Sequence, residues 1–429
     1  MKKFIRIATA VLSAALVASC GNSGNNEEAF VPALPKDTVC TIKVAGSYSN
    51  FEALEMEFDR FKTFYNKDLA LEYVKPDDYD NNLGTILSGK DKPNIFFAEP
   101  KMLDNEKYAA VVPHMEDLSD PNLKLNLDCI RPNLINRDKD GKVRMVPIFS
   151  RTYGALVNVD LFKKEGIEIP TTWSGLVSAC EAFLAKNYKS PIMGYSKDKK
   201  PSSGLMNVIA YPLFIADLAK NPEALRLAND LDPAAGAYMR PALEKIKTLI
   251  DKGCINIQEC DQIGDNYTKT LLRFLAGDVP MMVCNGDTVS GAKKREKESP
   301  EYKANPFNYQ FYPIPVTEQG GYFVDSVSLQ FAVNKDCDNL DMTNEFMRFL
   351  LRSNELNDMA ASKGLISTSK SKSSNAVYAP FNNVPAERTI SPEDIGVKDT
   401  LATQIRIASY EVGKGMDIDT AVSKYGQFN

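Results

Sequence analysis

Two residue types that often carry chemistry are scarce, because the 429 residues of the chain include one histidine and one tryptophan. A single histidine, His114, excludes a zinc site built from several imidazole groups. It stands between Pro113 and the acidic residues Glu116 and Asp117, a polar setting that predicts a surface position. The sequence also lacks a Gly-x-Ser-x-Gly motif and a glycine-rich phosphate loop. We therefore expect no enzyme activity and no cofactor, with a glycosidase built on two acidic residues as the enzymatic alternative.

A metal site is not expected either, although the stretch from Asn136 to Gly141 is similar to the first half of an EF-hand calcium loop. The glutamate that closes such a loop would fall on Pro147, which has no carboxylate. We interpret the stretch as a polar turn before a strand.

The N-terminus has the parts of a bacterial export signal. Basic residues stand at positions 2, 3 and 6, an apolar run extends from residue 7 to 17, and Cys20 follows two small residues. The run is too short to span about 30 Å of hydrocarbon, and a signal peptidase admits small residues. We predict that residues 1–19 are a lipoprotein signal peptide and that Cys20 carries a lipid, which anchors the protein outside the cytoplasmic membrane, in the periplasm or on the cell surface. An ordinary secretory signal is the alternative.

The segment after the signal, residues 20–37, begins with small polar residues that cannot bury enough surface to fold, so we expect a flexible tether. Loss of the signal peptide reduces the basic residues from 51 to 48 against 56 acidic ones, a net charge of −8. An acidic surface does not neutralise phosphates, so we do not expect a nucleic-acid partner.

The remaining cysteines form no regular pattern. Seven follow Cys20, an odd number that leaves at least one thiol unpaired. Cys254 and Cys260 are the pair that an oxidising compartment could join. Several of the seven stand at apolar positions, where a thiol behaves as a small hydrophobic group, so we favour buried free thiols. They are Cys40, Cys129, Cys180, Cys254, Cys260, Cys284 and Cys337.

Strand and helix patterns alternate from residue 38 onward. The first unit predicts strands at 40–45, 69–73 and 94–98, with helices at 51–65 and 78–88 between them. The pattern returns with strands at 145–148 and 154–158 and a helix that opens at Trp173. A chain of this length normally forms two or more domains, so we expect a second α/β lobe to begin near residue 150.

Three stretches together resemble the extracellular solute-binding proteins of ABC importers, in the large sugar-binding branch that includes maltose-binding and glycerol-phosphate-binding proteins. The first runs from Val146 to Gly166 and on to the Pro-Thr-Thr-Trp helix start at 170–173. The second is Phe274–Gly286, which is similar to the family's Phe-x-x-Gly, apolar strand and Asn-Gly turn. The third runs from Val327 to Ser367. Taken in order, these stretches extend the resemblance over residues 38–370.

The resemblance implies an α/β fold of two discontinuous, doubly wound lobes with a hinge and a ligand cleft between them, as in type II periplasmic binding proteins. Residues 38–149 and 328–373 would form the N-lobe, and residues 150–327 and 374–429 the C-lobe. The chain would cross between the lobes near residues 148–152, 324–328 and 372–379.

The resemblance also implies the function. The chain would capture a small polar solute, a mono- or short saccharide, by lobe closure and deliver it to an ABC permease. A binder of a phosphorylated polyol such as a glycerol phosphate is one alternative, and a surface lipoprotein or adhesin that kept the fold without a ligand is another. The only tryptophan, Trp173, has the position of a core residue, so any stacking on a sugar ring must use Tyr or Phe.

Ligands of α/β sheets lie beyond the carboxyl ends of the strands, where loops and helix N-termini present polar groups. In this chain those places are residues 46–49, 98–101, 150–153, 285–288 and 322–326. The candidate ligand-binding residues are Ser47, Tyr48, Glu99, Ser150, Arg151, Tyr153, Tyr211, Asp287 and Asp325.

Arg151 is the sharpest candidate, since the resemblance places it on the crossing strand, where a guanidinium could bind hydroxyls or an anion through two hydrogen bonds. Its structural alternative is a salt bridge between the lobes. The other candidates have alternatives too. Ser47 and Tyr48 could cap a helix, Glu99 could be a surface acid, the two tyrosines could be core or wall residues, and Asp287 could be a turn residue.

Overall fold

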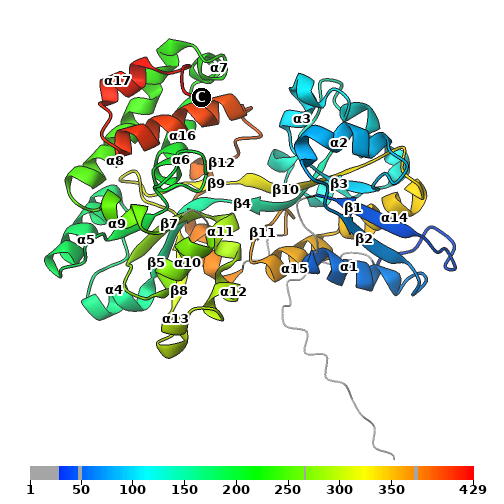
Figure 1. The fold of residues 1–429 in the computed structure, drawn as a ribbon, viewed down its shortest axis with the longest axis horizontal. Coiled ribbons are helices and arrows are strands. Elements are labelled where there is room, and N and C mark those ends of the chain that lie inside the picture. The colour runs from blue at the N-terminus through cyan, green and yellow to red at the C-terminus, as the bar shows by residue number, and fades with distance from the viewer. Residues whose placement is uncertain (1–28, 47–50, 265–266, 372–374) are drawn as a thin grey trace, which may run out of the picture.

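The computed structural model describes residues 29–46, 51–264, 267–371 and 375–429, and it has two lobes, each built around a β-sheet (Figure 1). A six-stranded sheet forms the first lobe and a four-stranded sheet the second, with helices against both. This arrangement confirms the predicted α/β class. None of the helices in the described ranges combines the length and apolar character that a membrane crossing requires.

The first-lobe sheet has the strand order β11-β4-β10-β3-β1-β2. β1 (Thr41–Ala45) pairs in parallel with β2 (Ala70–Val74) and β3 (Ile95–Ala98), which is the predicted βαβαβ unit. β10 (Ser326–Val333) lies antiparallel between β3 and β4 (Val146–Arg151), and β11 (Ile366–Ser367) forms the edge. The sheet therefore joins segments that lie far apart in the sequence.

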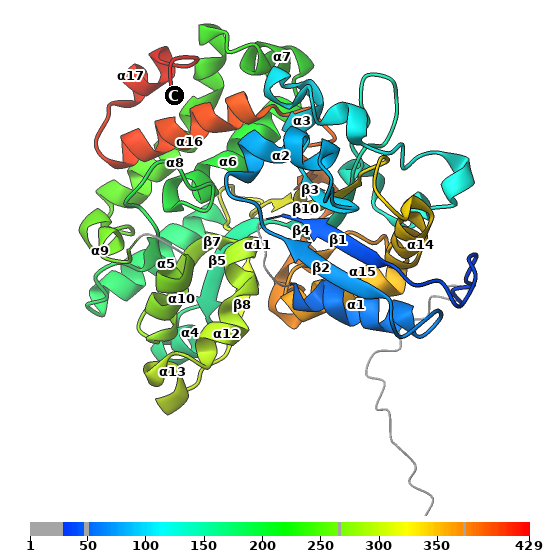
Figure 2. The same cartoon turned by 45° about the vertical axis from the view of Figure 1, so that its right-hand side comes forward.

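Helices cover both faces of this sheet (Figure 2). One face packs on α1 (Glu52–Lys62), α14 (Leu340–Leu350) and α15 (Ser353–Lys363). The other packs on α2 (Tyr79–Ser88) and α3 (Lys101–Asp104). Because helices bury both faces, the central strands are apolar on both sides, as the run 94–98 predicted.

The second-lobe sheet has the order β6-β7-β5-β8. β5 (Tyr153–Asn158) is antiparallel to β7 (Met281–Asn285) and β8 (Tyr309–Tyr312), and β6 (Ile192–Gly194) is parallel to β7. A two-stranded ribbon pairs β9 (Phe323–Val324) with β12 (Thr389–Ile390).

The helices of the second lobe include α6 (Leu205–Ala219), which is buried along almost its whole length and packs against α8 (Arg240–Asp251) and α16 (Asp399–Gly413). The others are α4 (Val159–Glu165), α5 (Trp173–Ala185), α7 (Pro222–Asn229), α9 (Ile257–Asp261), α10 (Tyr267–Leu275), α11 (Gly286–Ser290), α12 (Ala292–Glu296), α13 (Pro300–Ala304) and α17 (Ile418–Ser423). Short 3-10 turns occur at 106–108, 112–114, 121–123, 127–129, 132–134, 233–239, 376–383 and 386–388.

Two segments connect the first-lobe sheet to the second lobe. β4 leads through Thr152 into β5 of the four-stranded sheet, and β9 of the two-stranded ribbon leads through Asp325 into β10. These are two of the three places where the resemblance puts a crossing. The third, near residues 372–379, falls partly outside the described residues, and the exact lobe boundaries stay a prediction.

Residues 29–37, which we assigned to the tether, lie against the first lobe. The Phe30 ring is buried and contacts the rings of Phe64 and Phe349, with centroid distances of 5.1 and 5.2 Å. The Arg348 guanidinium donates to the carbonyl oxygen of Val31 at 2.6 Å. The signal peptide and Cys20 lie outside the described residues.

Three smaller features have the structure that the sequence indicated. Trp173 is half-buried against the second-lobe core, and Lys245 Nζ lies 4.0 Å from the centre of its ring. The Asp138 carboxylate accepts hydrogen bonds from the backbone N–H groups of Asp140 and Lys142, which closes the polar turn. The seven described cysteines are free, six of them buried and Cys40 half-buried, so the buried-thiol interpretation is confirmed.

Candidate ligand-binding cleft

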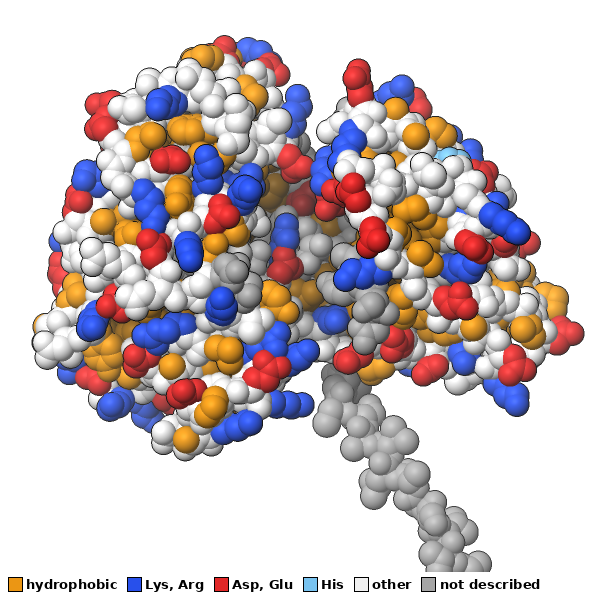
Figure 3. Space-filling model, in the orientation of Figure 1, with side chains coloured by type: hydrophobic (Ala, Val, Ile, Leu, Met, Phe, Trp, Pro, Cys, Tyr) orange, Lys and Arg blue, Asp and Glu red, His pale blue; other side chains and the backbone are white. Residues whose placement is uncertain are grey.

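The two sheets direct the carboxyl ends of several strands toward each other. In the first lobe these are the ends of β1, β3 and β4, which run in the same direction, and in the second lobe the ends of β6 and β7. The space-filling view has a hollow between the lobes, with acidic and basic side chains in its depth (Figure 3). Loops and helix N-termini at such a junction can present polar groups to a ligand from both sides.

An ion pair joins the first crossing strand to the second lobe at this junction. Arg151, the last residue of β4, donates through Nη1 to the Asp287 carboxylate at the start of α11. The other carboxylate oxygen of Asp287 accepts from Ser328 Oγ on β10 at 2.6 Å. We call Arg151 and Asp287 the cleft pair. Three segments therefore meet at a single carboxylate.

The cleft pair remains open to solvent, with exposed side-chain fractions of 26% for Arg151 and 36% for Asp287. Burial disfavours the charged form of Arg151, but the Asp287 carboxylate outweighs it and raises the pKa of the guanidinium. Arg151 Nε is buried and has no hydrogen-bond partner in the described structure. The pair is thus a charged, accessible group that can still donate a hydrogen bond.

Tyr153 and Tyr211 form one wall of the second lobe beside the cleft pair. Their ring centroids lie 5.4 Å apart in an edge-to-face arrangement, and each residue is 6% exposed. Burial raises the pKa of both phenols. Both rings belong to the hydrophobic core of the second lobe and offer little face to a stacking sugar, which favours the core or wall alternative.

Glu393 reaches the same region from the C-terminal part of the chain. Its carboxylate accepts from the backbone N–H of Val327 at 2.8 Å and from Ser326 Oγ at 3.0 Å. Burial raises the pKa of Glu393. These hydrogen bonds join the start of β10 to the segment that follows β12.

Ser150 and Asp325 both contact Arg131, a residue that was not among the candidates. Arg131 Nε and Nη2 donate to the two carboxylate oxygens of Asp325 at 2.9 and 2.8 Å, and Nη2 also donates to Ser150 Oγ at 2.9 Å. Arg131 Nη1 donates to the carbonyl oxygens of Ser367 and Ser369. We call these five residues the hinge clamp.

The hinge clamp is buried, with side-chain exposure of 10% for Arg131 and 2% for Asp325. Asn133 Nδ2 adds a third hydrogen bond to Asp325 at 3.0 Å. The polar atoms of Ser150 and Asp325 are thus engaged within the protein, where they connect both crossing strands and the segment after β11.

The remaining candidates are Glu99, at the carboxyl end of β3, and two residues outside the described ranges. Glu99 is exposed just after β3 and forms an ion pair with Lys101. Ser47 and Tyr48 fall outside the described residues. The single histidine, His114, contacts Asp336 through Nδ1 at 2.7 Å in a partly exposed pair.

Sequence reasoning missed Arg131, Ser328 and Glu393. Ser328 had a faint signal, since it interrupts an apolar strand with a hydroxyl next to a predicted crossing. Arg131 and Glu393 had none, because their partners lie 194 and 66 residues away in the sequence.

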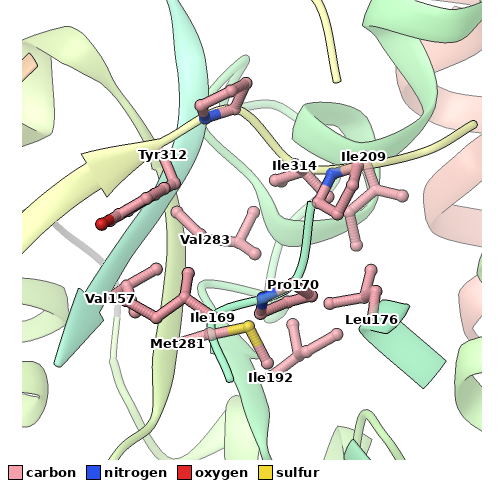
Figure 4. A pocket seen from close by; sticks show the side chains of 13 residues that line it. Val157, Ile169, Pro170, Leu176, Ile192, Ile209, Met281, Val283, Tyr312 and Ile314 are labelled. Carbon is pink, nitrogen blue, oxygen red and sulfur yellow. The ribbon is translucent and has the colours of Figure 1, made fainter. Parts of the chain in front are cut away.

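An apolar cavity in the second lobe contrasts with the cleft (Figure 4). Its lining side chains include Val157, Ile192, Met281, Val283 and Ile314, between the sheet and α5. No charged side chain lines this cavity, so it offers a polar solute no hydrogen-bonding set. The cleft between the lobes is the better candidate site.

Comparison with known proteins agrees with this architecture. A family described as "Bacterial extracellular solute-binding protein" matches residues 58–383. No curated protein sequence matches the chain.

Solved structures share the fold at low sequence identity. The apo form of RafE from Streptococcus pneumoniae has 17% identity and a TM-score of 0.70, over 92% of this chain and 98% of that one. A sugar transporter from Bacillus licheniformis in complex with stachyose has 17% identity and a TM-score of 0.63, over 90% and 98%. The sugar-binding protein MalE from Xanthomonas citri has 16% identity and a TM-score of 0.66, over 90% and 96%.

Proposed function

The chain belongs to the bacterial extracellular solute-binding proteins, and from this premise we propose that it captures a mono- or short saccharide between its lobes and delivers it to an ABC permease. The observation that carries the proposal is the meeting of Arg151, Asp287 and Ser328 between the two sheets. Paired donors and acceptors of this kind can bind neighbouring hydroxyl groups.

The proposed contacts follow from the accessibility of each group. Arg151 and Asp287 bind ligand oxygens and hydroxyls, Tyr153 and Tyr211 form the wall, and Glu99 faces the ligand from the first lobe. Ser150 and Asp325 act indirectly, by holding the crossing strands in place. Ser47 and Tyr48 stay predictions from the sequence.

A short ligand is favoured over a long one. The only indole, Trp173, is covered by Lys245 and half-buried, so it provides no platform on which a chain of sugar rings could stack. The complexes of structural neighbours with raffinose and stachyose support a carbohydrate ligand.

Capture would occur by lobe closure. A ligand that touches both lobes only when they are closed binds that state better and shifts the population toward it. A ligand-saturated sample should therefore give a smaller radius of gyration in solution scattering than the free protein. Identical profiles, with binding confirmed by calorimetry, would contradict closure.

The anchor is part of the proposal as well. We propose that Cys20 carries a lipid, because two small residues precede it at the end of a short apolar run. Replacing Cys20→Ser in a bacterial host should release the protein from the membrane fraction and remove its acylation. Retention of both would refute lipidation at this residue.

The function is tested by a thermal-shift screen of the mature protein against glucose, maltose, raffinose, stachyose and glycerol 3-phosphate, with hits measured by calorimetry. A ligand at a hundredfold excess over Kd stabilises the folded state by about 2.7 kcal/mol. A saccharide hit supports the proposal. A hit with glycerol phosphate alone points to the polyol alternative, and no hit among these and a wider carbohydrate set points to a surface lipoprotein without a ligand.

A further inference from the structure

Helix α16, which precedes the last helix α17, carries a guanidinium in the second lobe. It lies outside the residues that the family matches, 58–383. Arg406 lies on the face of α16 that also carries Thr403 and Tyr410, three and four residues away.

The face borders the carboxyl end of the second-lobe sheet. Tyr410 donates through its hydroxyl to the carbonyl oxygen of Lys197 at 3.4 Å, and Lys197 follows β6 by three residues. β6 runs parallel to β7, whose carboxyl end leads to Asp287 of the cleft pair. Arg406 also lies close enough to Tyr153 for its charge to oppose the rise that burial causes in the pKa of that phenol. Arg406 is thus on the cleft side of α16.

Arg406 has few partners for a half-buried cation. Its Nη2 donates to Thr403 Oγ1, in its own helix, at 3.0 Å, while its Nε is buried without a partner. Within the described ranges it makes no ion pair, which is also true of the half-buried Arg388, whereas arginines 131, 144, 151 and 348 each bind a carboxylate. A partly desolvated guanidinium without a carboxylate is unfavourable unless another group supplies the negative charge.

The neighbouring loop has the same sign of charge. Residues 197–200 read Lys-Asp-Lys-Lys, and the Asp198 carboxylate is engaged by the backbone N–H of Lys200 at 2.9 Å. The three lysines and one aspartate give this loop a net charge of +2, which favours anions over cations. Lys and Arg side chains, interspersed with acidic ones, are visible on the second lobe beside the hollow (Figure 3).

We propose that Arg406 binds an anionic oxygen group of the ligand, so that the solute is a saccharide that carries a carboxylate or a phosphate. This inference rests on the proposed function and narrows its ligand class. The planar guanidinium can bind two oxygens of such a group at once, and its charge does not change with pH in the accessible range.

The test compares sugars that differ in one anionic group. Wild-type protein is titrated by calorimetry with galactose and galacturonate, and with glucose and glucose 6-phosphate. We expect at least one acid to bind about tenfold or more tightly than its neutral counterpart. Galacturonate tests for a carboxylate and glucose 6-phosphate tests for a phosphate, so the two titrations identify which anionic group is bound.

Arg406→Met should weaken binding of the preferred acid by about 10- to 150-fold and leave the affinity for the neutral sugar nearly unchanged. Arg406→Lys, which keeps the charge but loses the planar fork, should fall between. Arg137→Met is the matched control, since Arg137 is a surface arginine that binds the carbonyl oxygen of Gly141. The melting temperature of each free variant shows whether it is folded.

The outcomes separate this inference from the proposed function. If neutral sugars bind as tightly as their acids and Arg406→Met changes neither, the proposed function stands and the inference is overturned. It is also overturned if Arg406→Met and Arg137→Met weaken acid binding equally. If the wild type binds no carbohydrate of any charge, the proposed function fails and the inference fails with it.

Discussion

The hinge clamp and the cleft pair are two arginine–carboxylate contacts with the same chemistry and different surroundings. In the clamp, Arg131 and Asp325 have exposed side-chain fractions of 10% and 2%, and Asp325 receives three hydrogen bonds. In the cleft pair, Arg151 and Asp287 have exposed fractions of 26% and 36%. A fully satisfied, buried pair fixes a conformation, whereas an accessible pair can exchange its partners for those of a ligand.

The difference has a physical basis in solvation. A buried charge that loses its partner keeps the full cost of desolvation, so the clamp cannot open cheaply. A partly exposed charge regains some water when its partner leaves, so the cleft pair contributes less to stability than the clamp and is available for recognition. We therefore expect mutations in the clamp to affect folding and mutations in the cleft pair to affect binding.

The largest effect is expected for Arg131→Met. This change leaves the Asp325 carboxylate buried without its guanidinium and should lower the free energy of unfolding by about 3–5 kcal/mol. Urea unfolding of the mature protein measures it. The double variant Arg131→Met with Asp325→Leu should recover part of the loss, because it removes the stranded charge. A single variant as stable as the wild type would show that the clamp does not hold the hinge.

A smaller effect, on binding, is expected for Arg151→Met. Loss of a charged hydrogen bond to the ligand should cost about 1.5–3 kcal/mol, a 10- to 150-fold rise in Kd, while the free energy of unfolding changes by about 1 kcal/mol or less. Arg151→Lys should also weaken binding, because lysine lacks the planar fork. Calorimetry with the identified ligand, together with urea unfolding, separates the two quantities. Unchanged affinity with altered stability would make Arg151 a bridge between the lobes and not a ligand contact.

The smallest effect is expected for Glu57 on α1, a buried carboxylate whose guanidinium partner, Arg60, is exposed. It is buried and shares the Arg60 guanidinium with Glu355 and Asp358. Burial, assisted by the two neighbouring acids and opposed by Arg60, raises the pKa of Glu57 from 4.5 to about 7. The folded protein therefore binds the proton of the Glu57 carboxyl group more tightly than the unfolded chain does.

The sign of the pH dependence follows from that difference. The free-energy cost of ionising Glu57 in the folded protein is absent below pH 4.5 and grows as the pH rises from 4.5 to about 7. The free energy of unfolding therefore falls over that window. Glu57→Gln should melt about 1–3 °C above the wild type at pH 8 and close to it at pH 5. Melting curves of both proteins across this range test the prediction. A variant that is less stable than the wild type at pH 8 would contradict it.

Much of the fold followed from local patterns. Apolar residues at strand and helix spacing placed β1, β3, β5 and α5 within a few residues of their observed bounds, because each element buries a regular face. The resemblance placed Arg151 on the crossing strand, and the sequence places Asp287 directly after the Asn-Gly turn. Their contact with each other could not be predicted, since 136 residues separate them.

Local sequence therefore determined the α/β class and the residue types at the strand ends, and the family resemblance supplied the two crossing strands. The tertiary structure decided which of those side chains are accessible to a ligand and which are hydrogen-bonded within the protein. Asp287 follows β7 and Asp325 stands at a crossing, yet Arg131 reaches only Asp325, from a loop far away in the sequence, and satisfies it in the interior. The burial of a side chain and its hydrogen-bond partners depend on how distant segments pack. A local sequence pattern therefore cannot predict a contact with a guanidinium from a distant segment.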